Sequence, residues 1–148
     1  MQFGNLETIA VFPADEILRF AVLPKHRKTF VINGISYKVN MSYEKYIMFI
    51  KNKTCVCCGV KGEYMVLQKK PSDISPHFNL YGLKNGKHVL MTKDHIIPKS
   101  KGGKNGFYNL RTMCEICNSV RGNEYLTMDQ LLEKVERLYG FECCSKVA

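Results

Sequence analysis

The sequence predicts an α+β fold, and three observations indicate this class. Two β-rich stretches are each interrupted by Asn-Gly, which favours a two-residue hairpin turn because both residues tolerate a positive φ. A helix with clear start and end signals follows near the C-terminus. Two Cys-x-x-Cys pairs flank the second hairpin. We therefore expect a small sheet and its helices to be tied into one core by a structural metal ion.

The length and composition suit one compact unit with a small appendage. The 148 residues are 45% hydrophobic and 11% aromatic, which is enough for a core and argues against a disordered chain. The best apolar run, residues 46–50, is far shorter than the roughly 18 residues of a membrane span, so no membrane partner is expected. The N-terminus lacks the basic start and cleavage site of a signal peptide, so a cytoplasmic location is expected.

The net charge is strongly positive and unevenly distributed. Lys and Arg total 22 against 13 Asp and Glu, a formal charge of +9. Residues 84–121 hold 8 basic and 2 acidic residues, whereas residues 122–148 hold 3 basic and 5 acidic residues. Such an excess indicates a polyanionic partner, usually nucleic acid, that binds the middle of the chain. The alternative from charge alone is a soluble basic protein without such a partner.

Residues 1–50 are expected to form an N-terminal extension made of a hairpin and a helix. A short strand and a helical turn are expected within residues 8–20. The first Asn-Gly hairpin spans residues 29–39. Ser42 then has the character of a helix cap, and Tyr46 belongs to an apolar set at helical spacing that favours a core position. The extension is a candidate surface for a protein partner or for homodimerisation.

Residues 51–126 are expected to form the core. Residues 60–76 show no clear element and are interpreted as a variable connection. The second hairpin covers residues 78–97, with Asn-Gly at its turn. The loop at residues 98–106 contains three Lys and three Gly, and a helix is expected to begin near Cys114.

Residues 127–148 are expected to form a C-terminal helix and a tail. Thr127 is the expected cap, Gln130 completes a capping box, and Gly140 ends the helix. The apolar residues between these signals form one stripe, which predicts that one face of the helix packs on the core.

Seven cysteines in a chain without a secretory signal favour metal binding over a disulfide framework. The two pairs that have metal-ligand spacing are Cys55 and Cys58, followed by Cys114 and Cys117. Two such pairs fit the tetrahedral geometry of a structural zinc ion. The alternative is that these cysteines are redox-active or simply buried. No role is predicted for Cys57, Cys143 or Cys144.

The residues between and after the cysteine pairs carry a resemblance to a known family. They run Asp94-His95-Ile96-Ile97-Pro98-Lys99-Ser100-Lys101-Gly102-Gly103, then Asn109-Leu110, then Cys114-x-x-Cys117-Asn118. Over about residues 55–122 this order resembles the HNH endonucleases. The resemblance implies a ββα-metal core, here inside a zinc-closed loop. Residues 78–81 and 90–93 are also similar to small phage-type members, which would act in the cytoplasm of a host cell.

The position after the second cysteine pair departs from the family name, because Asn118 stands where the last His is expected. This resembles the HNN variant, such as the HNH domain of the CRISPR RNA-guided nucleases. The resemblance implies that Asp94 and Asn118 are oxygen ligands of a catalytic Mg²⁺. It also gives Asn109 a part in tying the loop and orienting His95.

The residues taken on their own terms agree with phosphodiester hydrolysis, which needs an activated water and a cation. His95 is the motif residue that titrates near neutrality and is therefore the candidate general base. A carboxylate and an amide carbonyl are hard ligands that suit Mg²⁺ or Mn²⁺. The candidate contacts to nucleic acid are Lys99, Lys101, Lys104 and Arg121.

These observations predict a metal-dependent endonuclease that acts by a single-metal mechanism with His95 as base; DNA is favoured as the substrate, and RNA is left open. The alternative is a catalytically silent zinc-binding module that docks on nucleic acid or on a nucleic-acid-processing protein. Such a module would need only the four cysteines. The presence of Asp94, His95, Asn109 and Asn118 together favours the enzyme.

Overall fold

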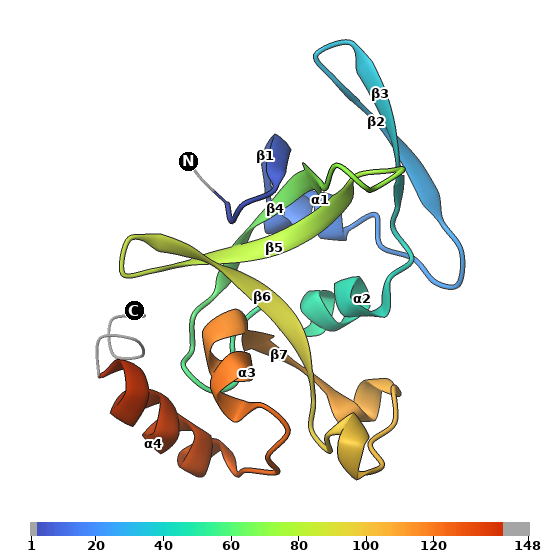
Figure 1. Ribbon diagram of the computed structural model, residues 1–148. Helices are drawn as coiled ribbons and strands as arrows, with labels where there is room; N and C mark the ends of the chain where they lie inside the picture. Colours follow the sequence, from blue (N-terminus) through green and yellow to red (C-terminus); the bar gives the residue numbers. More distant parts are fainter. Residues whose placement is uncertain (1–2, 141–148) are drawn as a thin grey trace.

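The structure, a computed structural model, describes residues 3–140 of the chain and has a mixed α+β architecture. Five strands form one antiparallel sheet in the order β1-β4-β5-β6-β7, and β2 and β3 form a separate two-stranded ribbon (Figure 1). The strands are β1 (Glu7–Pro13), β2 (Arg27–Ile32), β3 (Ile35–Asn40), β4 (Gly62–Lys69), β5 (His77–Lys84), β6 (Lys87–His95) and β7 (Leu110–Cys114). The helices are α1 (Ala14–Leu18), α2 (Glu44–Lys51), α3 (Glu115–Arg121) and α4 (Met128–Tyr139), with 3-10 turns η1 (Lys99–Lys101) and η2 (Phe107–Asn109).

Both Asn-Gly dipeptides form the hairpin turns that the sequence predicts. Asn33 and Gly34 have φ angles of 51° and 78° between β2 and β3, and Asn85 and Gly86 have the same two values between β5 and β6. Positive φ at both turn positions matches the right-handed twist of the flanking strands. The second turn therefore fixes the register of β6, which ends at the candidate site.

The connection expected at residues 60–76 is wrong, because this stretch contains β4. Residues Met65, Val66 and Leu67 of β4 are fully buried, and the strand lies between β1 and β5 in the sheet. A strand that is covered on both faces is apolar without alternation. The period-two pattern that marks a half-buried strand is therefore missing here.

Strand β1 is part of the five-stranded sheet, and helix α2 packs against that sheet. Strand β1 pairs with β4, and the buried Tyr46 of α2 donates its hydroxyl hydrogen bond to the carbonyl of Phe78 in β5 at 2.9 Å. Helix α2 has Tyr43 as its N-cap, with no side-chain cap bond, so the expected cap at Ser42 is wrong. The Ser42 hydroxyl instead donates to the side-chain oxygen of Asn40, which closes the end of β3.

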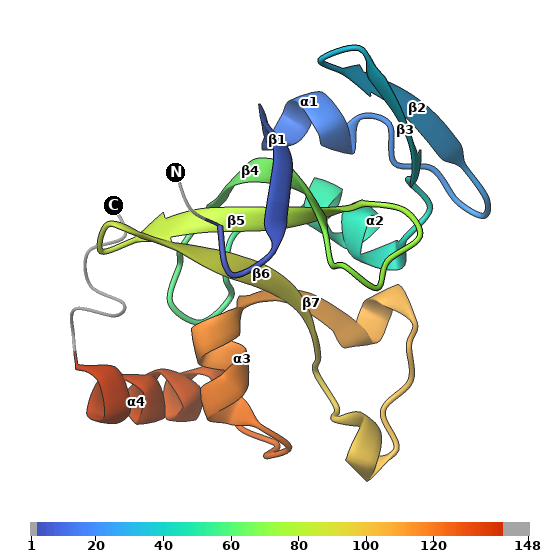
Figure 2. The ribbon, with the colours of Figure 1, turned by 45° about the horizontal axis from the view of Figure 1, so that its top comes forward.

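The C-terminal helix α4 agrees with its sequence signals. Thr127 and Gln130 form the predicted capping box, and Gly140 is the C-cap with a φ of 76°. The helix packs against α3, as Figure 2 shows, and buries Leu131 and Val135. The expected tail, with Cys143 and Cys144, lies outside the described residues. Within residues 3–140, no helix has both the length and the apolar character needed to cross a membrane.

Strands β6 and β7 and helix α3 position the candidate site. The two strands pair antiparallel, with His95 opposite Leu110 and Met91 opposite Cys114. Helix α3 begins directly after β7, where the Cys114 side chain accepts a hydrogen bond from the Cys117 backbone and caps the helix. The long loop between the strands contains η1 and η2 and leaves the sheet at His95. One end of this unit therefore carries cysteines and the other carries His95.

Candidate functional site

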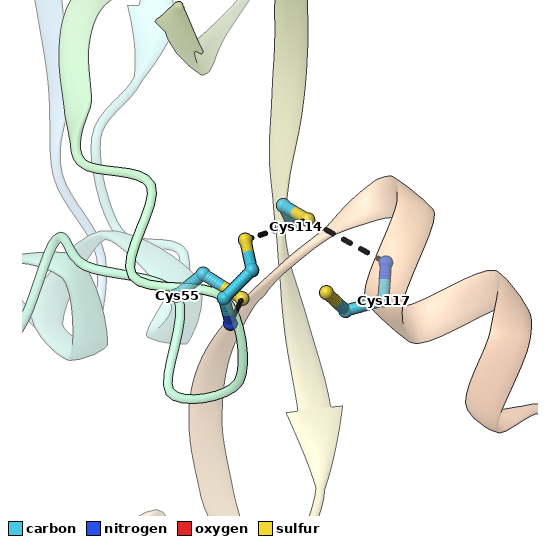
Figure 3. A group of neighbouring side chains, drawn as sticks. Cys55, Cys114 and Cys117 are labelled. Atoms are coloured by element: carbon cyan, nitrogen blue, oxygen red, sulfur yellow. Dashed lines mark hydrogen bonds between the residues drawn. The ribbon is translucent and has the colours of Figure 1, made fainter. Parts of the chain in front are cut away.

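The four paired cysteines lie together in the folded chain. Their sulfur atoms are all within 4.8 Å of one another, and all four side chains are buried. Cys55 and Cys58 lie on the turn before β4. Cys114 ends β7 and Cys117 lies in the first turn of α3, and Figure 3 labels these two with Cys55. This buried cluster has the ligand type, number and spacing that suit a metal ion such as zinc. Cys57, in the same turn, is outside the cluster.

A buried lysine accompanies the cysteine cluster. Lys84, at the end of β5, is only 5% exposed, and its Nζ lies 3.1 Å from the Cys58 sulfur and 3.7 Å from the Cys114 sulfur. Hydrogen bonds from the Cys114 and Cys117 thiols also hold the pKa of the Cys58 thiol below its usual range. An ammonium group here offsets the negative charge that thiolates bring into the core. The sequence gives no sign of this contact, because a lysine before Asn-Gly is typical of an exposed turn.

The other end of the β6–β7–α3 unit holds a cavity of about 250 Å³. Three of the predicted catalytic residues line it together: Asp94, His95 and Asn118. Asp94 and His95 are neighbours on β6, and adjacent strand residues ordinarily point to opposite faces. They share one cavity because the strand ends at His95. Lys93, Lys99 and Arg121 also line the cavity.

Asp94 is buried between two arginines. Arg111 Nε lies 2.8 Å from one carboxylate oxygen, and Arg121 Nη1 lies 2.9 Å from the other. Asp94 and Arg121 are each 3% exposed, so Arg121 is a buried partner of the carboxylate and not a free surface cation. In the described part of the chain, Arg111 Nη2 and Arg121 Nε have no hydrogen-bond partner. Two cations against one carboxylate leave a net positive charge beneath the cavity.

His95 is half-buried, and its ring has one side-chain hydrogen bond within the described residues 3–140. Its Nε2 lies 2.9 Å from the amide oxygen of Asn105, which belongs to the loop between the two strands. An amide oxygen only accepts hydrogen bonds, so with Asn105 in this orientation the imidazole carries its proton on Nε2. Nδ1 is then the basic nitrogen. Sequence reasoning missed Asn105, because a loop asparagine before glycine is typical of a turn residue.

Asn109 lies behind the cavity and ties the loop. Its amide oxygen accepts from the Ile97 backbone at 2.8 Å, and its amide nitrogen donates to the carbonyls of Ile97 and Lys104 at 3.1 and 2.7 Å. Gly103 packs against the same backbone, because a Cβ there would stand 1.8 Å from the Ile97 oxygen. Asn109 therefore holds the segment that follows His95 and does not itself line the cavity.

The orientation of Asn118 is set by a threonine hydroxyl. Thr92 Oγ1 donates its one hydrogen to the Met113 carbonyl at 2.7 Å and accepts from Asn118 Nδ2 at 2.8 Å. The Asn118 amide nitrogen is thereby assigned to the strand side, and the amide oxygen makes no hydrogen bond within residues 3–140. Asn118 lines the cavity, so it brings an uncommitted oxygen donor to the position beside Asp94 and His95. Thr92 was not anticipated from the sequence, because its partners are distant along the chain.

Comparison with protein families gave a match, and it covers the segment that contains all the residues lining this cavity. Residues 83–129 match the family described as HNH endonuclease. This segment, about a third of the chain, is therefore similar to HNH endonucleases. Comparison with curated proteins and with solved structures gave no significant match.

The HNH segment contains β6, β7, α3 and the second cysteine pair, while the first pair lies before it. Of the lysines singled out in its loop, Lys99 lines the cavity, whereas Lys101 and Lys104 are exposed beside it. The cavity is therefore rimmed and underlaid by positive charge. A phosphate diester carries the complementary charge.

Proposed function

We propose that this protein is a metal-dependent endonuclease that hydrolyses phosphodiester bonds in DNA. The observation that carries the proposal is the meeting of Asp94, His95 and Asn118 on one positively charged cavity. We propose that β6, β7 and α3 are a ββα-metal core of the HNN variant, with zinc on the four cysteines. In this proposal residues 51–126 are the nuclease core, residues 1–50 an extension and residues 127–148 a C-terminal helix and tail.

The donor set of the cavity fits a hard divalent cation. The Asn118 amide oxygen is uncommitted within residues 3–140, and each Asp94 oxygen has one arginine contact and therefore one further acceptor position. Asp94 and Asn118 would hold Mg²⁺ or Mn²⁺ through these atoms. Asp94 is the single carboxylate among the lining residues, which supports one cation rather than two. When bound, the cation neutralises charge that develops on the phosphate oxygens.

The chain's own residues supply the remaining chemistry. His95 accepts the proton of the attacking water at Nδ1, while Asn105 holds the Nε2–H and fixes the ring. Asn109 keeps the loop after His95 in place. Lys99 on the rim and the arginine pair beneath attract the phosphate.

A second candidate is a catalytically silent zinc module that docks on nucleic acid. One observation favours it: both Asp94 oxygens are already engaged by arginines. In a silent module, Asp94 would be a purely structural anion, and the cavity would bind phosphate without cleaving it.

A plasmid assay separates the two candidates. The wild type is incubated with supercoiled DNA, and in parallel with a folded RNA, in Mg²⁺, Mn²⁺ or EDTA. We expect nicking of DNA that needs the divalent ion and that falls at least about 100-fold in His95→Ala. His26→Ala, a histidine outside the HNH segment, is the matched control and keeps full activity. Tight DNA binding without metal-dependent cleavage would establish the silent module instead.

A further inference from the structure

A second cavity is lined by Arg111, the residue that is hydrogen-bonded to Asp94 of the His95 site. It has a volume of about 180 Å³, and its lining includes Met48, Lys51 and Asn52 from the end of α2 with Phe107, Leu110 and Arg111 from the η2–β7 segment. Arg111 lines only this second cavity, and its Nε donates a hydrogen bond to Asp94, which lines the first. The second cavity is therefore joined to the candidate active site through one side chain.

The lining of this cavity combines an aromatic ring with positive charge. Lys51 Nζ lies 5.0 Å from the centre of the Phe107 ring, and both side chains are exposed. No carboxylate is among the lining residues, and Arg111 Nη2 has no acceptor within residues 3–140. An exposed ring beside cations is the arrangement that binds nucleic acid strands without reading sequence, because every base has a π-face and every nucleotide a phosphate.

The position of the cavity agrees with this ligand class. Phe107 belongs to η2, the turn that ends at Asn109 and so at the loop that carries His95. Lys51 and Met48 come from α2, outside the matched HNH segment. Helix α2 thus supplies a part of the cavity wall that lies outside the HNH segment.

We propose that this second cavity is a subsite for one nucleotide of the substrate strand, next to the phosphate bound at His95. The base stacks on Phe107, and the phosphate of that nucleotide lies against Lys51, within the positive field of Arg111. The proposal rests on the proposed function, because it assumes a nucleic acid strand at the first cavity. It assigns substrate positioning, and no chemical step, to Lys51 and Phe107.

Binding measurements without catalytic metal test the subsite apart from cleavage. Zinc-loaded protein is titrated into a fluorescent single-stranded oligonucleotide in Mg²⁺-free buffer, at several salt concentrations. Phe107→Leu keeps apolar bulk but removes the ring, and we expect it to weaken binding about tenfold with an unchanged salt slope. Lys51→Met keeps the aliphatic stem, and we expect it to flatten the slope of log affinity against log salt by about 0.7. Phe107→Trp should bind at least as tightly as the wild type.

An oligonucleotide of abasic residues, which has phosphates but no bases, supplies the decisive comparison. On this probe Phe107→Leu should match the wild type, while Lys51→Met should still flatten the slope. The controls are Tyr108→Leu, an exposed ring that does not line the cavity, and Lys70→Met, an exposed lysine elsewhere. Zinc content and melting temperature show that each variant is folded.

Three outcomes would overturn the subsite. Equal losses for Phe107→Leu on normal and abasic strands would mean that the ring does not stack on a base. Equal losses for Tyr108→Leu and Phe107→Leu would mean a general aromatic surface and no defined cavity. A wild type that cuts plasmid while both cavity variants bind normally would refute the subsite alone, whereas a wild type that never cuts would refute the proposed nuclease.

Discussion

The two ends of the β6–β7–α3 unit differ in how deeply their functional side chains are buried and in how well their charges are balanced. At one end, four buried sulfur atoms converge, and Lys84 supplies a single compensating charge. At the other end, a carboxylate, an imidazole and an amide line an open cavity, and the carboxylate is held by two arginines. The four sulfurs of the cysteine end are already arranged as a full set of ligands for one metal ion. The His95 end has excess positive charge, which an anionic substrate would neutralise.

One small unit can thus combine a stabilising site with a site for chemistry. When the metal ligands are buried and close together, the free energy of metal binding adds directly to the free energy of folding. Ligands on an open cavity leave positions for water and substrate, as catalytic metal sites require. Four sets of variants, from the largest expected effect to the smallest, test whether the two ends are as different as their geometry indicates.

Removal of a cysteine ligand should have the largest effect. Cys55→Ser removes one of the four sulfur ligands, so the metal binds weakly and no longer stabilises the fold. Because the total unfolding free energy of a domain is only about 5–15 kcal/mol, this loss is large enough to unfold the protein. We expect loss of bound zinc and of cooperative unfolding, measured by metal analysis and circular dichroism. Cys57→Ser, in the same turn but outside the cluster, should keep both. A well-folded wild type free of zinc would contradict the metal assignment.

Removal of the Asp94 carboxylate should be the next largest effect. Asp94→Ala leaves the buried Arg121 and the half-buried Arg111 without their carboxylate partner, which costs about 3–5 kcal/mol of unfolding free energy. Asn118→Ala removes a single hydrogen bond to Thr92 and should cost about 1 kcal/mol. Urea unfolding measures both. If the two variants are equally stable, the arginine pair does not depend on Asp94.

The Thr92 hydroxyl should matter for metal use more than for folding. Thr92→Val keeps the side-chain shape but cannot hold the Asn118 amide, so the catalytic ion should bind about 10- to 100-fold more weakly. Thr92→Ser keeps the hydroxyl and should restore binding. Mn²⁺ titration followed by electron paramagnetic resonance gives the affinity directly, and the Mg²⁺ dependence of nicking gives a second measure. Equal Mn²⁺ affinity in Val and Ser variants would exclude this orienting role.

The smallest effect is expected from the loop lysines. Replacing Lys99, Lys101 and Lys104 together with Ala should flatten the salt dependence of duplex binding by up to about 0.9 for each phosphate that is no longer neutralised. Affinity for two unrelated duplexes should fall by the same factor, because point charges do not read bases. A triple Ala variant at the exposed Lys25, Lys38 and Lys70 makes the same change in net charge and is the control. Identical slopes in the two triple variants would mean that the loop is merely solvated.

Sequence patterns predicted the local features of this molecule well. Asn33-Gly34 and Asn85-Gly86 encode their own turns, and Thr127 with Gln130 encodes the start of α4. The cysteine spacing predicted a four-residue cluster because each pair is local, and only their meeting depends on the fold.

Features that depend on distant partners were beyond sequence reasoning. Strand β4 has no alternation because both of its faces are covered by other parts of the chain. Arg111 contacts Asp94 across 17 positions, and Lys84 meets Cys58 across 26. The Asp94, His95 and Asn118 assignments stay predictions, and the structure adds the arrangement that makes them testable.

The pairing of β1 with β4 determines which fragments of this chain would expose an unpaired strand edge. Strand β4 is almost entirely apolar at its centre, with Met65, Val66 and Leu67 fully buried, and β1 covers its outer backbone edge. Strand β1 has a register shift between Thr8 and Ala10 and ends at Pro13, which makes its own outer edge a poor template for another strand. A fragment that begins after residue 50 would expose the β4 edge and should aggregate through strand pairing between molecules. We therefore expect that any fragment which keeps β4 stays monomeric only if it also keeps the segment up to Pro13, which pairs with that edge.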